Sequence, residues 1–506
     1  MQQMINAVRA RLGAAVIAAV LLAVCSQPAA SQILYGSLTG NVTDPSGAAV
    51  VGATVTITQT ATNQSRTTTT NDAGIYNFPT IPGGTYEVRV QAQGFRTLIR
   101  KDVTVSTNAV ARVDAQLELG AVSESIQVTG EAALLQTDRA EVRQELPSVV
   151  LLNTPIPPGR NYQQLFNLLP GFTPPRNAHS VPSNPSRSLQ FEVNGTVAAS
   201  NNIRLDGATQ YNIWLPHITA YVPALESIET VNVVTNAFDA EQGLAGGAAI
   251  NVQIKSGTND LHGSAFWYHD NNRTKARPFF LPFDQDKPKR VFNQNGGTVG
   301  GPIRKDKLFY FVSYEGTYDR QFAGGLSTVP TPLMKRGDMS ESPRIVYDPQ
   351  TGDDQGRNRT PFPNQIIPES RWDPITRKLL PLIPNPTAAG QFTDNYYSQG
   401  NYLFDRHTID TKMNWNISDR MTSYVRFSWL DYSMTAPTRF GRELLGSALA
   451  GGNPGAGYGN TYSVTAAYTY TITPTFVIDT NFGYTLMDTN VEQYGIERNI
   501  GQELGI

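Results

Sequence analysis

The most regular feature of the chain is a two-residue alternation of apolar and polar side chains in its second half. The even positions between residues 406 and 417 are strongly polar and include Arg406, Asp410 and Lys412. Segments 425–429, 462–472 and 476–485 repeat the alternation. Because successive side chains of a strand point to opposite faces, these segments are predicted to be β-strands with one apolar face. In the first of them that face comprises His407, Ile409, Thr411, Met413, Trp415 and Ile417.

Two kinds of sheet fit this alternation. Strands that cross a bilayer need about 9 to 11 residues and turn every second side chain toward lipid. A soluble antiparallel sheet with one solvated face shows the same pattern, so the alternation by itself leaves both open. The short predicted turn Ser418–Arg420 at one end, and long connections at the other, favour a membrane barrel.

The segment 33–119 consists of short β-prone runs separated by turn residues. Asp44–Gly47, Asn71–Gly74 and Pro82–Gly84 supply the turns, and the runs between them predict a seven-stranded sandwich. The aromatic residues Tyr76, Phe78 and Tyr86 stand at alternating strand positions. Such residues are usually core, so we favour a core position for them over a sugar-stacking surface.

The N-terminus has the layout of a secretory signal peptide. Arg9 and Arg11 precede an apolar run from Leu12 to Val24, and small residues follow at 29–31. Cleavage after residue 31 is therefore expected. The single cysteine, Cys25, falls inside this segment, so the mature chain can build neither a disulfide framework nor a cysteine-ligated metal site. Lipidation of Cys25 is the alternative, although Val24 is bulky for a lipoprotein signal.

Composition excludes several classes of function. Lys and Arg number 40 against 42 Asp and Glu, a net charge of -2 that offers no basic field for nucleic acid. The five histidines have no metal-ligand spacing, and no nucleophile elbow or other catalytic motif occurs. We therefore expect no cofactor, no metal and no enzymatic activity. The richness in Gly, Tyr and Phe, at 43, 22 and 21 residues, suits a mainly β fold.

An ordered series of residues in the first unit resembles the carboxypeptidase regulatory-like domain. The resemblance implies a transthyretin-like, carbohydrate-binding-like β-sandwich that serves as an accessory module. The matching positions are Gly40, Val42, Asp44, Gly47, Val50, Gly52, Ala53, Val55, Thr70, Asn71, Gly74, Tyr76, Phe78, Gly84, Tyr86, Val88, Val90, Ala92, Gly94 and Phe95.

The remainder of the chain resembles TonB-dependent outer-membrane receptors, in particular their Oar-like subgroup. The motifs that carry the resemblance are Phe238–Gly243, Gly246–Gly247, Lys255–Asn259, Asn295–Gly297, Gly300–Ile303, Phe309–Phe311 and Tyr314–Gly316. This resemblance implies a linker at 120–140, an α+β plug domain at 141–255 and an antiparallel transmembrane β-barrel from 256 to 506. It also implies an outer-membrane location and import or translocation of an unidentified ligand, which is an oligosaccharide, a peptide or a protein. Receptors of this type close with about 22 strands, whereas the segment after the plug has room for roughly seven to ten at the usual strand length. We therefore expect a partial barrel in a truncated form of the protein.

Within the linker, a β-prone stretch looks like a TonB box. Its residues are Glu124, Ser125, Ile126, Gln127, Val128 and Thr129. A mobile strand of this kind adds to the sheet edge of a partner, here the TonB–ExbB–ExbD energy-coupling complex, and transmits a pull through backbone hydrogen bonds. The stretch is alternatively the last strand of the sandwich, or simply a linker.

Three further expectations concern the plug. Arg160 is expected to contact the barrel by pairing with a carboxylate of its wall. Asp206–Gly207 is expected to form a tight turn, and Glu226 with Glu229 a solvated face.

The segment between Gly316 and Tyr402, which is rich in proline, is expected to be an extracellular loop that contacts the ligand. An alternative function for the whole chain is a surface or periplasmic glycan-binding or adhesion protein without transport.

Overall fold

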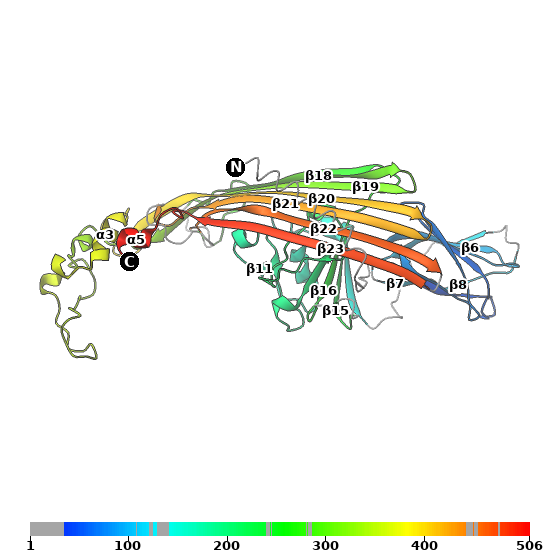
Figure 1. Cartoon of the computed structure of the whole chain (residues 1–506), viewed down its shortest axis with the longest axis horizontal. Coiled ribbons are helices and arrows are strands. Elements are labelled where there is room, and N and C mark those ends of the chain that lie inside the picture. The colour runs from blue at the N-terminus through cyan, green and yellow to red at the C-terminus, as the bar shows by residue number, and fades with distance from the viewer. Residues whose placement is uncertain are drawn as a thin grey trace.

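The computed structural model describes residues 35–107, 109–120, 125–128, 141–238, 243, 245–279, 281, 286–441, 449, 454–473 and 476–506. The predicted signal peptide, Glu124, Thr129 and most of the Phe238–Gly243 motif lie outside the described residues. A sandwich, a plug and one long sheet succeed one another along the chain (Figure 1). The predicted mainly β fold is thus confirmed. Within the described ranges, no helix is both long and apolar enough to cross a membrane.

The sandwich packs two sheets around an apolar core. One sheet is β4–β1–β7 with β8 also on β1, and the other is β3–β2–β5–β6–β9. The bounds are β1 Gly36–Thr43, β2 Thr54–Gln59, β3 Ser65–Thr69, β4 Ile75–Ile81, β5 Gly84–Gln91, β6 Thr97–Val105, β7 Val110–Arg112, β8 Ala115–Gln116 and β9 Ser125–Val128. The short strands β7 and β8 both pair in parallel with β1, one after the other, and together occupy one strand position. The sandwich therefore has the seven expected strand positions, and β9 adds one more.

The three aromatic residues of the sandwich lie in its core. Tyr76, Phe78 and Tyr86 are buried beside Leu38, and burial raises the pKa of Tyr86. The Tyr86 hydroxyl donates a 2.6 Å hydrogen bond to the Pro82 carbonyl. The expected core position is confirmed, and these three rings are not available to stack on a sugar.

The plug is built on a five-stranded sheet of order β10–β15–β16–β13–β14. Its strands are β10 Val142–Pro147, β13 Asn202–Leu205, β14 Ala208–Thr209, β15 Ile228–Asn236 and β16 Ala249–Ile254, with a small hairpin of β11 Arg176–Asn177 and β12 Leu189–Gln190. Helical turns are short: α2 Ser148–Asn153, η1 Tyr162–Leu168, η2 Val181–Ser183, η3 Ala198–Ser200 and η4 Leu225–Ser227. The segment η1 is a 3-10 helix, and the Asn161 side chain caps it by accepting a hydrogen bond from the Gln163 amide.

The second half of the chain forms a seven-stranded antiparallel sheet in sequential order. It arches over the plug (Figure 1). Because β17 and β23 each have one neighbour, the sheet formed by the described residues is open. The strands are β17 His262–Asn271, β18 Arg290–Arg304, β19 Leu308–Ser327, β20 Tyr396–Ser418, β21 Met421–Ala436, β22 Gly455–Thr473 and β23 Phe476–Gln493.

The connections of this sheet differ sharply between its two ends. At the end where the sandwich lies, two or three residues of sequence separate β18 from β19, β20 from β21 and β22 from β23. At the other end, at least 18 residues separate β17 from β18, β19 from β20 and β21 from β22. Outer-membrane barrels have short periplasmic turns and longer extracellular loops. The sandwich is therefore at the periplasmic end, at the right of Figure 1, and the long loop is at the extracellular end.

The loop predicted between Gly316 and Tyr402 is shorter than expected, because β19 continues to Ser327 and β20 already begins at Tyr396. Residues 328–395 contain η6 Met334–Arg336, η7 Pro363–Gln365, η8 Glu369–Arg371, α3 Pro374–Leu379 and η9 Leu380–Leu382, and α5 Ile500–Leu504 lies beside α3 (Figure 1). At about 3.4 Å per residue, the 23 residues of β20 extend far beyond a hydrocarbon core of about 30 Å.

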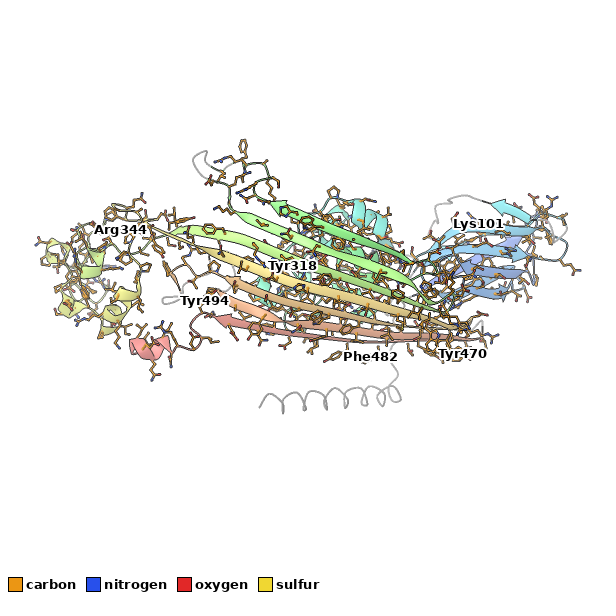
Figure 2. All side chains as sticks on the ribbon, turned by 90° about the horizontal axis from the view of Figure 1, so that it is seen from above. Lys101, Tyr318, Arg344, Tyr470, Phe482 and Tyr494 are labelled. Atoms are coloured by element: carbon orange, nitrogen blue, oxygen red, sulfur yellow. The ribbon has the colours of Figure 1, made fainter. Side chains whose placement is uncertain are left out.

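The predicted alternation is present in the burial of the long sheet. Along β21, residues with even numbers are buried against the plug, and Val425 and Phe427 are exposed on the opposite face. Trp415 of β20 and Phe482 of β23 are each 51% exposed on that outer face. Figure 2 shows Phe482 and Tyr470 toward the periplasmic end of the strands, with Tyr494 at the other end. One face of the sheet is therefore apolar and exposed, as lipid contact requires.

Candidate functional site

The inner face of the sheet and the facing surface of the plug share a set of buried charges. The tightest cluster centres on Asp206, which is 1% exposed. Its Oδ1 accepts a 2.9 Å hydrogen bond from Lys412 Nζ of β20, and its Oδ2 lies 3.6 Å from Arg426 Nε of β21. The Tyr424 hydroxyl donates a 3.0 Å hydrogen bond to the Asp206 carbonyl. One plug residue therefore contacts two neighbouring strands of the wall.

Arg426 is fully buried, and both of its Nη atoms donate hydrogen bonds. Its Nη2 donates to Thr465 Oγ1 at 2.6 Å and to Ser463 Oγ at 3.0 Å, both on β22, and its Nη1 donates to Ser428 Oγ at 2.7 Å. Lys412 Nζ also donates to the Ile254 carbonyl at 2.9 Å, at the end of β16. These bonds orient both cations toward the plug.

In a second contact between plug and wall, the carboxylate belongs to the wall and the plug supplies the donors. Asp410 of β20 accepts hydrogen bonds from the Tyr221 hydroxyl at 2.8 Å and from Ser227 Oγ at 3.0 Å, both in the plug. Ser428 Oγ of the neighbouring strand donates to the same carboxylate at 2.6 Å. Asp410 is thus satisfied without a formal ion pair at hydrogen-bond distance.

Toward the extracellular end, arginines bridge the two parts. Arg406 of β20 donates to Glu315 of β19 at 3.1 Å and to the plug carbonyl of Ser186 at 3.1 Å. Arg187 of the plug lies 3.3 Å from Asp319 of β19, and its guanidinium stands 3.8 Å from the centre of the Phe404 ring. The interface is therefore ionic along much of its length.

Arg160 contacts the wall in a different way from the one expected. Its Nη1 lies 2.9 Å from Glu226 Oε1, so its carboxylate partner belongs to the plug itself. Its guanidinium lies 4.0 Å from the centre of the Tyr268 ring on β17. The contact with the wall is therefore a cation–π contact. The expected solvated face is wrong for Glu226, which is 7% exposed, and holds for Glu229, which is exposed.

Buried charges at the interface between plug and wall favour one position of the plug over others. A buried ion pair adds little net stability over apolar packing, but removal of one partner strands a charge and costs about 3–5 kcal/mol. The plug is therefore favoured in the position in which Asp206 lies beside Lys412 and Arg426. Leaving that position requires work, or water to replace the lost contacts.

The candidate TonB box is an edge strand in the structure. Residues Ser125–Val128 form β9, which runs parallel to β6 with Ser125 opposite Thr97 and Val128 opposite Arg100. The structure thus places this part of the segment on the sandwich sheet. Its role in coupling remains a proposal.

The extracellular loop encloses a broad surface cavity of about 930 Å³. Trp372 and Phe440 supply aromatic surface, and Lys335 and Arg377 supply positive charge. Nearby, Arg371 donates to Asp348 Oδ2 at 2.9 Å, and this guanidinium lowers the pKa of Asp348 below its usual range. In the ranges that the structure covers, no three His, Cys, Asp or Glu side chains are placed to hold a metal ion.

Sequence reasoning identified the polar face of β20 but missed its partner Asp206. Asp206–Gly207 is the expected turn, with Asp206 at a φ of 43°. Its side chain is nevertheless directed into a buried interface. The sequence around Asp206 reads as an ordinary turn after the apolar residues Ile203 and Leu205, and it carries no signal of this contact.

A lipid-facing sheet that curves over a plug, with a sandwich at its short-turn end, defines the class of plugged outer-membrane β-barrels. Comparison with known families agrees with this class. Residues 253–506 match the family described as outer membrane beta barrel domain, and residues 37–118 match the carboxypeptidase regulatory-like domain. The chain belongs to the outer membrane beta barrel domain family.

Among curated proteins, the chain is similar to the TonB-dependent transporter Oar of Myxococcus xanthus. The two are 26% identical over 313 residues, which cover 58% of this chain and 28% of that protein. The chain thus spans less than a third of the length of this relative. The predicted resemblance to TonB-dependent receptors of the Oar-like subgroup is confirmed, the relative is a transport protein and not an enzyme, and the family locates the protein in the outer membrane.

Two solved structures share weaker similarity. The siderophore receptor PirA of Acinetobacter baumannii is 15% identical with a TM-score of 0.34, over 65% of this chain and 39% of that chain. The outer membrane transporter YddB of Escherichia coli is 11% identical with a TM-score of 0.40, over 68% of this chain and 39% of that chain.

Proposed function

We propose that the protein is a TonB-dependent transporter that moves a ligand across the outer membrane when the TonB–ExbB–ExbD complex pulls on it. The observation that carries this proposal is the seating of the plug, through Asp206, Lys412 and Arg426, against the inner face of a lipid-facing sheet. A plug held by a few buried charge contacts is stable at rest. The same contacts are lost together when the plug is displaced, so a pull converts into a discrete rearrangement.

The proposed point of pull is the segment Glu124–Thr129. An added strand pairs through backbone N–H and C=O groups, which carry load along the strand axis. In the sequence, β9 is followed by β10 of the plug, which begins at Val142. Force applied at Ile126 therefore reaches the sheet that carries Asp206 through β10, β15, β16 and β13.

The proposed ligand contact is the cavity of the extracellular loop. Trp372 and Phe440 offer stacking surface, and the cations Lys335 and Arg377 offer donors. The chemistry of this lining suits an oligosaccharide, a peptide or a protein segment, and the proposed function is the same for each. Displacement of the plug then opens the way past the inner wall.

A backbone substitution in the coupling segment tests this function without a known ligand. Gln127→Pro removes the N–H that strand addition requires, whereas Gln127→Ala retains it. We expect the Pro variant to capture at least tenfold less of the purified TonB periplasmic domain in detergent. The Ala variant should match the unmodified protein.

Two results would count against the proposal in different ways. Equal capture by the Pro and Ala variants would show that the coupling segment lies elsewhere. Absence of capture by the unmodified protein would remove the transporter function and leave a glycan-binding or adhesion protein, because such a protein has no need for energy coupling.

A further inference from the structure

The sandwich is docked against the periplasmic end of the barrel wall and is not merely tethered to it. Tyr35, the residue before β1, is buried between Tyr424 of β21 and Ala467 of β22. Tyr424 is the residue whose hydroxyl binds the Asp206 carbonyl. The sandwich therefore reaches, through one ring, the side chain that also holds the plug.

Three further hydrogen bonds join the sandwich to β10 of the plug and to the segment that connects the plug with the long sheet. The Asn259 amide donates a 2.9 Å hydrogen bond to the Ala61 carbonyl, which lies in the turn between β2 and β3. Arg143 Nη1 of β10 donates to the Thr107 carbonyl at 3.3 Å. The Ser106 hydroxyl donates to the Glu145 carboxylate of the same strand. The sandwich is thus attached to the plug strand β10 and to the segment between β16 and β17.

The three parts surround a cavity of about 200 Å³. Tyr35 and Gln59 line it from the sandwich, Glu229 from the plug, and Lys412 and Asn414 from β20. Lys412 is also the partner of Asp206. A space opened by displacement of the plug at this point is therefore lined in part by the sandwich.

We propose that the sandwich is a second closure of the translocation path, latched across the periplasmic end of the barrel by Tyr35. A ligand that passes the plug is retained until the sandwich undocks. The purpose of this closure rests on the proposed transport function, whereas its geometry does not.

The connectivity supplies the means of release. β9 is paired with β6 of the sandwich, and the same chain continues from β9 to the plug. A pull on the segment at Ile126 is therefore applied to the sandwich sheet as well as to β10. One partner thus acts on both closures.

Disulfide trapping tests the docked position. The only cysteine of the chain, Cys25, lies in the predicted signal peptide, so introduced cysteines have no background in the mature protein. We expect the pair Ala61→Cys with Asn259→Cys to cross-link at least tenfold faster than a control pair in outer membranes that contain the protein. The control pairs Asn259→Cys with Ser46→Cys, which stands in the turn beyond the far end of β1. Equal rates would overturn the proposal.

Accessibility of the wall beneath Tyr35 tests the closure itself. A single Ala467→Cys is expected to react slowly with a bulky, membrane-impermeant maleimide, and at least tenfold faster when Tyr35→Ala is added. Tyr35→Phe, which keeps the ring, should leave the rate low. Fast labelling with Tyr35 in place, or no change with Tyr35→Ala, would show that the sandwich closes nothing. These measurements require neither ligand nor TonB, so their failure is distinct from failure of the capture experiment.

Discussion

Replacement of Asp206 by asparagine is expected to loosen the plug without changing its shape. Asparagine tolerates the positive φ of this position as aspartate does. The substitution removes the carboxylate that pairs with buried Lys412 and lies 3.6 Å from Arg426. Breaking a buried pair in this way costs about 3 kcal/mol by the usual range. Amide hydrogen exchange of β13 and β14 should therefore accelerate on the order of 100-fold through local opening.

The matched control is Glu229→Gln, which also neutralises a plug carboxylate but at an exposed position. It should leave exchange in β13 unchanged. Adding Lys412→Met to Asp206→Asn removes one of the two stranded cations and should restore part of the protection. Exchange in Asp206→Asn at the rate of the unmodified protein would mean that this cluster does not hold the plug.

A charge on the outer face of the sheet is expected to impair membrane assembly. Phe427 of β21 is exposed on that face and has paired neighbours on both sides, Thr411 and Val464. Phe427→Arg should cost about 2–4 kcal/mol if the position lies near the bilayer midplane. The fraction of folded protein, measured by its heat-modifiable electrophoretic mobility in bilayers, should fall at least tenfold under mildly denaturing conditions.

Phe427→Leu serves as the apolar control and should assemble normally. In a soluble sheet the outer face meets water, and arginine there changes stability by less than about 0.5 kcal/mol. Normal assembly of Phe427→Arg would therefore support the soluble alternative.

The part of the fold that the sequence predicted is the part governed by periodicity. The alternation from Arg406 to Ile417 places each side chain of β20 on a face, and turn residues such as Asp44–Gly47 delimit the sandwich strands. Both signals are local, since they depend on two-residue spacing and on backbone conformation. The resemblance to a known family supplied the assembly of these units.

The interface between plug and wall was beyond prediction because it joins residues far apart in the chain. Asp206 and Lys412 meet through the arching of the sheet, and nothing near Asp206 in the sequence shows that its turn enters the lumen. Arg160 was expected to pair with a carboxylate of the wall, yet its carboxylate partner is Glu226 of the plug and its contact with the wall is the ring of Tyr268. A charged residue at a turn is ordinarily solvated, and only the three-dimensional arrangement identifies the exceptions.

The start of the extracellular loop was also predicted too early in the sequence. Gly316 suggested the end of a strand, but pairing with β20 continues to Ser327 opposite Tyr396. Neighbouring strands supply the hydrogen bonds that hold this extension. Strand ends depend on the partner as much as on local sequence, so they are poorly defined by turn residues alone.

Lipid contact along β21 can be measured residue by residue. Single cysteines at Val425, Phe427 and Trp429, and at Thr422, Tyr424 and Ser428, would each carry a fluorophore in the receptor reconstituted with brominated lipid. The expected result is strong quenching at the first three positions and little at the second three, which are buried against the plug and inner wall. Uniform quenching, or quenching at none of the six, would contradict a sheet with one face in lipid and the other on the plug.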